Sequence, residues 1–159
     1  MTYLGIDNGL RGGLVWLSET GEILRKEVMP TQNIGKNDIV DYDDLSVLLA
    51  FDLEAHVLFE GAAKFSQGVK ALCSTWHSCG IVETTLKSLK MRWEGIDAQR
   101  WQKAILPGRK SGETKAAALA TATKLWPREL WLETPRCSKP HDGMIDAALI
   151  AEYARRIRL

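Results

Sequence analysis

Four carboxylates in this 159-residue sequence follow or interrupt apolar segments, at positions where burial is expected. Asp7 ends the apolar run that opens the chain, and Glu60 ends the run HVLFE. Asp142 and Asp146 lie one helical turn apart at the start of a C-terminal amphipathic segment, so both would project from one helix face. Carboxylates gathered in a partly buried place repel one another unless a divalent cation lies among them. The four acids therefore predict a metal site.

An oxygen-only set of ligands favours Mg²⁺, or Mn²⁺ in its place, over zinc. A pair of such ions is the standard device for in-line hydrolysis of a phosphodiester, in which one activates water and the other stabilises the leaving 3′ oxygen. His141 precedes Asp142 and could orient that water or accept a proton, because its reference pKa is near neutral. The residues thus predict two-metal-ion phosphodiester hydrolysis.

Each acid also has an ordinary structural interpretation. Asp7 could be a turn residue, and Asp142 taken alone would be a helix N-cap. Glu60 is harder to explain this way, because an acid directly after Val57–Phe59 is costly to bury unless it is paired or bound to metal. Asp146 precedes AALIA in a largely apolar helix and should also point inward. A metal ion accounts for all four acids at once.

The elements that must position these acids can be predicted from apolar periodicity. Three short runs joined by glycine-containing turns indicate an antiparallel meander, and a helix followed by the strand ending at Glu60 implies a crossover. Residues at the carboxyl ends of neighbouring strands then meet at one edge of the sheet. We predict strands at 2–7, 12–17, 23–28 and 56–60, a loop at 30–40, and a helix at 41–54 with Asp41 as its N-cap.

In the remaining chain we predict helices at 69–85, 97–106, 114–126 and 142–159, a strand at 89–93, and loops at 61–68, 107–113 and 134–141. The last helix has the clearest amphipathic pattern, and its apolar stripe comprises Ile145, Ala148, Leu149, Tyr153 and Ile157. Its first turn carries the final two acids toward the sheet edge.

The length and composition are typical of one globular domain, which we place at 1–159. Hydrophobic residues make up 45% and charged residues 26%, and the formal net charge is only +1, so any DNA-binding surface must come from local clustering of cations. The three cysteines are unpaired in spacing, and no signal peptide or membrane span is evident, which favours a cytoplasmic protein. Cys73, His77 and Cys79 lack the second ligand pair of a zinc site.

Three segments together resemble the motifs of RuvC-like Holliday-junction resolvases, particularly their compact phage-type members. They are LGIDNGLRGGL (4–14), VLFEGAAKF (57–65) and KPHDGMIDAALIAEYARR (139–156), and the WQK and GETKAAALATATKLWP stretches are also similar to that subgroup. The resemblance spans nearly the whole chain. It implies an α/β, RNase H-like fold with a five-stranded mixed sheet flanked by helices. It also implies a homodimer that nicks four-way DNA junctions with Mg²⁺ in the cytoplasm of a bacterial host.

Carried over by position, Asp7 matches the first-strand acid of the family, Glu60 the second acid and Asp146 the final helical acid. The family's cellular members carry another ligand three positions before the last acid, which is Gly143 here. Asp142, four positions before, can share a helix face with Asp146 and take that role.

The same resemblance places an aromatic wedge near Phe65, which would stack on unpaired bases at the junction centre; packing in the core is an equal alternative. For Lys115, in the first turn of a helix, backbone N–H groups would help to hold a phosphate. The expected DNA contacts are Lys64, Phe65, Lys70, Arg109, Lys110 and Lys115.

The sequence argues against two other functions and leaves two open. A proofreading exonuclease would have an acid two residues after Asp7, where this chain has Gly9, and an actin-like ATPase would need a second domain of similar size. An RNase H-like nuclease acting on another substrate, such as RNA, and a weakly catalytic module that binds branched DNA both stay open.

Overall fold

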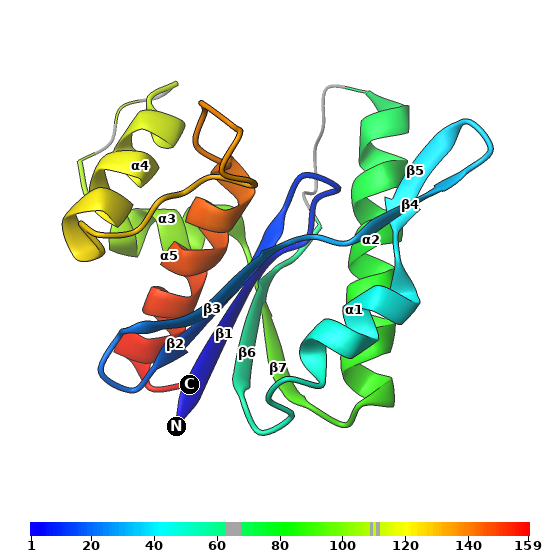
Figure 1. The fold of residues 1–159 in the computed structure, drawn as a ribbon, viewed down its shortest axis with the longest axis horizontal. Helices are drawn as coiled ribbons and strands as arrows, with labels where there is room; N and C mark the ends of the chain where they lie inside the picture. The colour runs from blue at the N-terminus through cyan, green and yellow to red at the C-terminus, as the bar shows by residue number, and fades with distance from the viewer. Residues whose placement is uncertain (63–67, 109, 111) are drawn as a thin grey trace.

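The computed structural model describes residues 1–62, 68–108, 110 and 112–159. Its main feature is a five-stranded sheet in the order β3-β2-β1-β6-β7 (Figure 1). The first three strands are antiparallel, whereas β6 and β7 run parallel to β1. The predicted mixed sheet is confirmed. The strands are β1 (Thr2–Asp7), β2 (Gly13–Ser18), β3 (Ile23–Val28), β6 (His56–Glu60) and β7 (Arg92–Ile96).

Helices cover both faces of the sheet (Figure 1). On one face α5 (Asp142–Ile157) lies against β1 and β2, with α3 (Ala98–Ile105) and α4 (Thr114–Leu125) packed against it. On the other face lie α1 (Tyr42–Leu49) and α2 (Val69–Ser88). Each side has its own hydrophobic cluster, and alternate residues of β1 supply both, with Tyr3 in one and Leu4 in the other.

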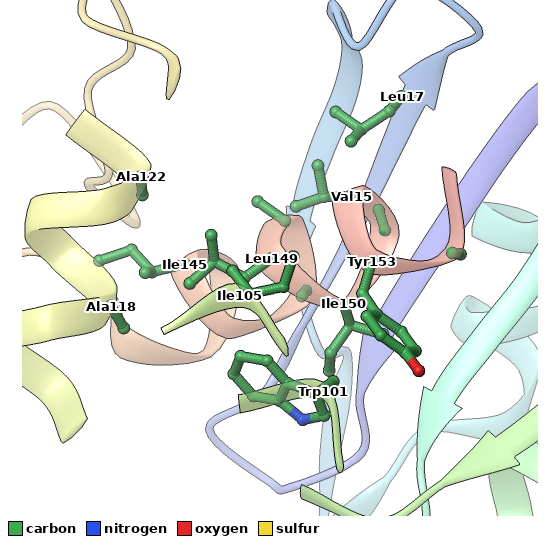
Figure 2. Close-up of a cluster of buried hydrophobic side chains, with 14 of the residues drawn as sticks. Val15, Leu17, Trp101, Ile105, Ala118, Ala122, Ile145, Leu149, Ile150 and Tyr153 are labelled. Carbon is green, nitrogen blue, oxygen red and sulfur yellow. The ribbon is translucent and has the colours of Figure 1, made fainter. Parts of the chain in front are cut away.

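Close packing of α5 on the sheet depends on glycine. A Cβ at Gly5 in the middle of β1 would lie 2.0 Å from the Ala147 carbonyl oxygen. Burial in α5 extends from Gly143 to Ala154 nearly all round, because the sheet covers one side and α3 and α4 cover the other. Figure 2 shows this cluster, with Trp101 and Ile105 of α3 and Ala118 of α4 around α5. Ile157, expected in the buried stripe, is 46% exposed, so that part of the prediction is wrong.

The predicted loop at 30–40 is wrong. This segment forms a two-stranded hairpin of β4 (Thr31–Ile34) and β5 (Asn37–Val40), and the turn between the strands contains Gly35 at φ +68°. All four β4 residues are exposed, so the alternating pattern that identifies a half-buried strand is missing.

Three other elements differ from prediction by three residues or more at a boundary. Helix α1 begins after the expected N-cap Asp41 but ends at Leu49, well before residue 54. Helix α2 continues to Ser88, and Lys90 at φ +56° then reverses the chain into β7, which therefore lies at Arg92–Ile96 rather than 89–93.

In the part of the chain that the structure describes, no helix is long and apolar enough to cross a membrane.

Candidate active site

Asp7 ends β1 at the centre of the sheet, where the chain turns into β2. Its carboxylate accepts a hydrogen bond from the Gly9 N–H, with 3.3 Å between Gly9 N and Asp7 Oδ1. The turn is compact, because a Cβ at Gly12 would lie 2.0 Å from the Asp7 carbonyl oxygen. Strand and turn together fix the Asp7 backbone at the carboxyl end of β1.

Glu60 ends β6, the parallel neighbour of β1, so the two acids lie at the same edge of the sheet, as predicted. Two side chains hold Glu60. The Trp101 indole Nε1–H donates to Glu60 Oε2 at 2.8 Å, and the Asn8 amide donates to the Glu60 main-chain carbonyl.

Helix α5 brings the remaining acids to this edge. Its N-cap is His141, not Asp142, and His141 Nδ1 accepts the Met144 N–H at 3.1 Å. The first turn touches the β1–β2 turn, where a bridge links Gly12 and Gly143, and a Cβ on Gly143 would lie 2.2 Å from the Arg11 carbonyl oxygen. This contact carries Asp142 and Asp146 toward Asp7.

The electrostatic environment shows that the acids are gathered together. Burial, together with the charges of Asp7, Glu60 and Asp142, raises the pKa of Asp146 to about 7, against the opposing effect of Lys115. Burial also raises the pKa of Glu60 to about 7, although the hydrogen bond from Trp101 lowers it and the charge of Asp7 raises it. The surrounding protein therefore does not fully compensate the negative charge that these carboxylates carry when they are ionised.

The pKa of Asp7 is shifted in the same direction. Burial raises its pKa, while the hydrogen bond from Gly9 and the charge of His141 act to lower it. Since His141 Nδ1 accepts a backbone hydrogen bond, a neutral His141 ring carries its proton on Nε2. The geometry thus favours His141 as a hydrogen-bond donor rather than as a proton acceptor.

Asp142 is the most exposed of the four acids and pairs with Lys115. The Lys115 Nζ lies 2.6 Å from Asp142 Oδ2, and the two side chains are 81% and 51% exposed. This hydrogen bond and the charge of Asp142 raise the pKa of Lys115. The predicted phosphate-binding lysine thus lies beside Asp7, Glu60, Asp142 and Asp146, which together form the acid cluster.

A cleft of about 720 Å³ opens beside these residues. Asp7, Asp142 and Asp146 line it together with His141, whereas Glu60 is not among the lining residues. Cations border the same cleft. They are Lys115, Arg11, and Arg136 and Lys139 of the loop before α5.

Of the other predicted DNA contacts, Lys64, Phe65 and Arg109 lie outside the described residues. Lys70 and Lys110 are exposed but do not line the cleft. Sequence reasoning missed Arg11, Arg136 and Lys139, whose only signal was their position next to the acid motifs, and Trp101 and Asn8, which gave no separate signal.

Among the described residues, no three His, Cys, Asp or Glu side chains already form a metal-binding group. Binding of a cation would therefore require the acid side chains to turn toward it. The donor set suits a hard divalent cation, because it consists of carboxylate oxygens with uncompensated charge. Cys73 is exposed and Cys79 is buried on α2.

No protein-family model matches this sequence, and no curated protein matches it either. Solved structures do match. A structure described as "T. thermophilus RuvC in complex with Holliday junction substrate" has a TM-score of 0.67 at 16% identity, covering 99% of this chain and 96% of that one. A second Thermus thermophilus RuvC structure has a TM-score of 0.61 at 15% identity, covering 99% and 97%. The chain therefore has the RuvC-like, RNase H-like α/β fold that its motifs predicted.

Proposed function

We propose that this protein is a divalent-metal-dependent endonuclease that resolves four-way (Holliday) and other branched DNA. The observation that carries the proposal is the convergence of Asp7, Glu60 and Asp146 at one edge of a RuvC-like sheet. Burial raises the pKa of all three acids, and repulsion from neighbouring carboxylates contributes to the shifts of Glu60 and Asp146. Such a cluster is unfavourable for stability alone, and perturbed carboxylates beside a cleft are typical of functional sites.

In this proposal Asp7, Glu60, Asp142 and Asp146 hold two Mg²⁺ or Mn²⁺ ions. Bound ions would supply the charge that activates a water molecule and stabilises the leaving 3′ oxygen. Asp142 becomes available when Lys115 leaves it for a phosphate. His141 donates from Nε2 to a phosphate oxygen or to water, while its Nδ1 keeps the α5 N-terminus in place.

The DNA backbone lies along the basic border of the cleft. Arg11, Lys115, Arg136 and Lys139 surround acids that would repel a phosphate in the absence of metal. Contacts from these side chains position the backbone without reading base sequence. This local clustering accounts for DNA binding by a chain whose formal net charge is only +1.

The direct test is cleavage of synthetic four-way junctions with Mg²⁺ or Mn²⁺. The wild-type protein should make paired nicks, and Asp7→Asn and Glu60→Gln should each reduce the nicking rate by more than about 100-fold, as loss of a charge-stabilising group does. Glu94→Gln, which alters an exposed acid on the neighbouring strand β7, should cut like wild type. Full activity in both site variants would reject the site.

The substrate panel separates the alternatives. Equal cutting of duplex and junction would reject junction selectivity, and preferential cutting of RNA would assign an RNA-processing role. Tight junction binding in EDTA with no cleavage in any metal would leave a DNA-binding module. The homodimer, the cytoplasmic location and the single domain at 1–159 stay predictions.

A further inference from the structure

Trp101 links the hydrophobic cluster to the acid cluster. It lies in α3, is fully buried, and packs in the same cluster as Ile105 and Ile150 (Figure 2). Its single polar atom, Nε1, donates to Glu60 Oε2 at 2.8 Å. A ring held on all sides by close packing can change its position only slightly, so this donor is fixed relative to Glu60.

This hydrogen bond is not a general property of buried tryptophan here. Trp16 and Trp131 are also buried, and their indole nitrogens have no hydrogen-bond partner among the described residues. Among the described residues, the protein thus leaves a buried indole N–H without a hydrogen bond in two other places. At Trp101 the donor lies against the one acid of the cluster that does not line the cleft.

Glu60 is held at its other end too. Asn8, 3% exposed and next to Asp7, donates its side-chain amide to the Glu60 main-chain carbonyl. Backbone and carboxylate of Glu60 are therefore both fixed, one by the residue after Asp7 and the other by α3. Oε1 is the carboxylate oxygen that the Trp101 hydrogen bond leaves free.

We propose that Trp101 is a positioning residue that orients the Glu60 carboxylate, with Oε1 free to bind the divalent cation. This inference rests on the proposed function, in which Glu60 binds a catalytic metal ion. Trp101 touches neither substrate nor metal and acts only through Glu60. Partners that hold a metal-binding carboxylate typically change metal affinity or activity by about 10- to 100-fold when removed.

The decisive variant keeps the ring and removes the donor. 3-Benzothienylalanine at position 101 has the shape of tryptophan, but a sulfur atom replaces the indole N–H. We expect Mn²⁺ affinity, measured by titration calorimetry, and the single-turnover nicking rate to fall about 10- to 100-fold, with junction affinity in EDTA unchanged. The same replacement at Trp16, whose N–H has no hydrogen-bond partner in the described part of the chain, should change neither the Mn²⁺ affinity nor the nicking rate. Trp101→Phe tests packing and donor together.

A second readout does not depend on activity. In protein labelled with ¹⁵N-tryptophan, the Trp101 indole proton should resonate downfield of that of Trp16, because it binds a carboxylate. Glu60→Gln should move it upfield, and Mg²⁺ should shift it in the wild-type protein. Trp16 should stay in place in both cases.

The outcomes separate the two proposals. The positioning role is overturned if the Trp101 indole resonance does not move in Glu60→Gln. It is also overturned if the protein with 3-benzothienylalanine at position 101 has wild-type Mn²⁺ affinity. The wild-type protein could cut no branched DNA while the Mn²⁺ affinity and the Trp101 indole resonance respond as expected. In that case the nuclease proposal fails, and the positioning of the Glu60 carboxylate by Trp101 stands.

Discussion

Asp146 shows, at the scale of single residues, how the acid cluster opposes folding. Burial and three neighbouring carboxylates raise its pKa to about 7 from an ordinary value of 3.8. A group whose pKa is higher in the folded than in the unfolded state stabilises the fold when protonated, and this stabilisation is lost as the pH rises through the folded-state pKa. For Asp146 the loss falls between about pH 4 and pH 7. Glu60 contributes in the same direction.

We therefore predict that Asp146→Asn raises the melting temperature of the metal-free protein at a pH above 7, although it abolishes nicking. The amide removes a buried charge that three carboxylates repel. Thermal unfolding in EDTA across the pH range should show a flatter profile for the variant than for wild type. Added Mg²⁺ should raise the wild-type melting temperature and have little effect on the variant.

Glu94→Gln serves as the control for this comparison, because Glu94 is exposed on β7. Its pH profile in EDTA should follow that of wild type. A wild-type protein whose stability rises with pH over the same window would contradict the assignment of uncompensated charge to the acid cluster.

Lys115 should matter for DNA and little for the fold. Its ion pair with Asp142 is exposed, and such pairs contribute about 1 kcal/mol or less. Lys115→Gln should therefore leave the melting temperature nearly unchanged, but weaken junction binding and reduce the slope of log affinity against log salt by about one. Lys124→Gln, an exposed change on the same helix that does not line the cleft, should leave the slope unchanged. Equal slopes for wild type, Lys115→Gln and Lys124→Gln would show that Lys115 does not contact a DNA phosphate.

The four acids could be predicted from sequence, because an acid directly after an apolar strand, or inside an apolar helix, is unusual without a ligand. Their surroundings could not. Trp101 is one of six tryptophans, and its hydrogen bond to Glu60 spans 41 positions in the chain. Likewise, His141 acts as the N-cap in place of Asp142, although aspartate is the commoner capping residue. Such details depend on where the tertiary fold places each side chain.

At the scale of elements, the contact between α5 and the β1–β2 turn decides whether the acids meet. Gly12 and Gly143 form a bridge there, and a Cβ at Gly143 would lie 2.5 Å from the Gly12 Cα. Any side chain at 143 must push the start of α5 away from β1. Asp142 and Asp146 would move with it.

Gly143→Ala should accordingly destabilise the protein by about 1 to 3 kcal/mol or more, as overpacking does, and sharply reduce nicking. Gly80→Ala is the matched control. Gly80 is exposed in the middle of α2 with no atom near its Cβ position, so alanine should stabilise the helix by about 0.5 to 1 kcal/mol. Denaturant unfolding and junction cleavage check both variants, and a Gly143→Ala protein with wild-type cleavage would show that this contact does not place the acids.

Elements with strong periodicity were predicted well, and elements without it were not. Strands β1 and β6 and helix α5 have apolar patterns that local sequence specifies fully. The β4–β5 hairpin has short, exposed strands, and β7 contains Gly95 and exposed positions, so neither shows the alternation of a half-buried strand. Helix α2 forms as predicted despite Gly80, and its buried residues Cys79, Val82 and Leu86 pack in the hydrophobic cluster on its face of the sheet.

At the scale of the whole molecule, the core closes independently of the acid cluster. Clusters of buried side chains lie on both faces of the sheet, and α5 contributes to one of them along most of its length. We therefore expect the protein to stay folded in EDTA. The same helix supplies the core and two of the four acids, which explains how an unfavourable site can be tolerated.

Paired nicks at symmetric positions of a junction need two catalytic sites, whereas the acids Asp7, Glu60, Asp142 and Asp146 form a single cluster in this chain. We therefore predict that the active species is a dimer, with twice the 17.8 kDa chain mass by sedimentation velocity. A dimer purified through two different tags, with Asp7→Asn in one subunit, should bind junctions normally and nick only one strand. The dimer with two wild-type subunits and different tags is the control. Paired nicks from the mixed dimer, or from a monomer, would show that one site can cut both strands in turn.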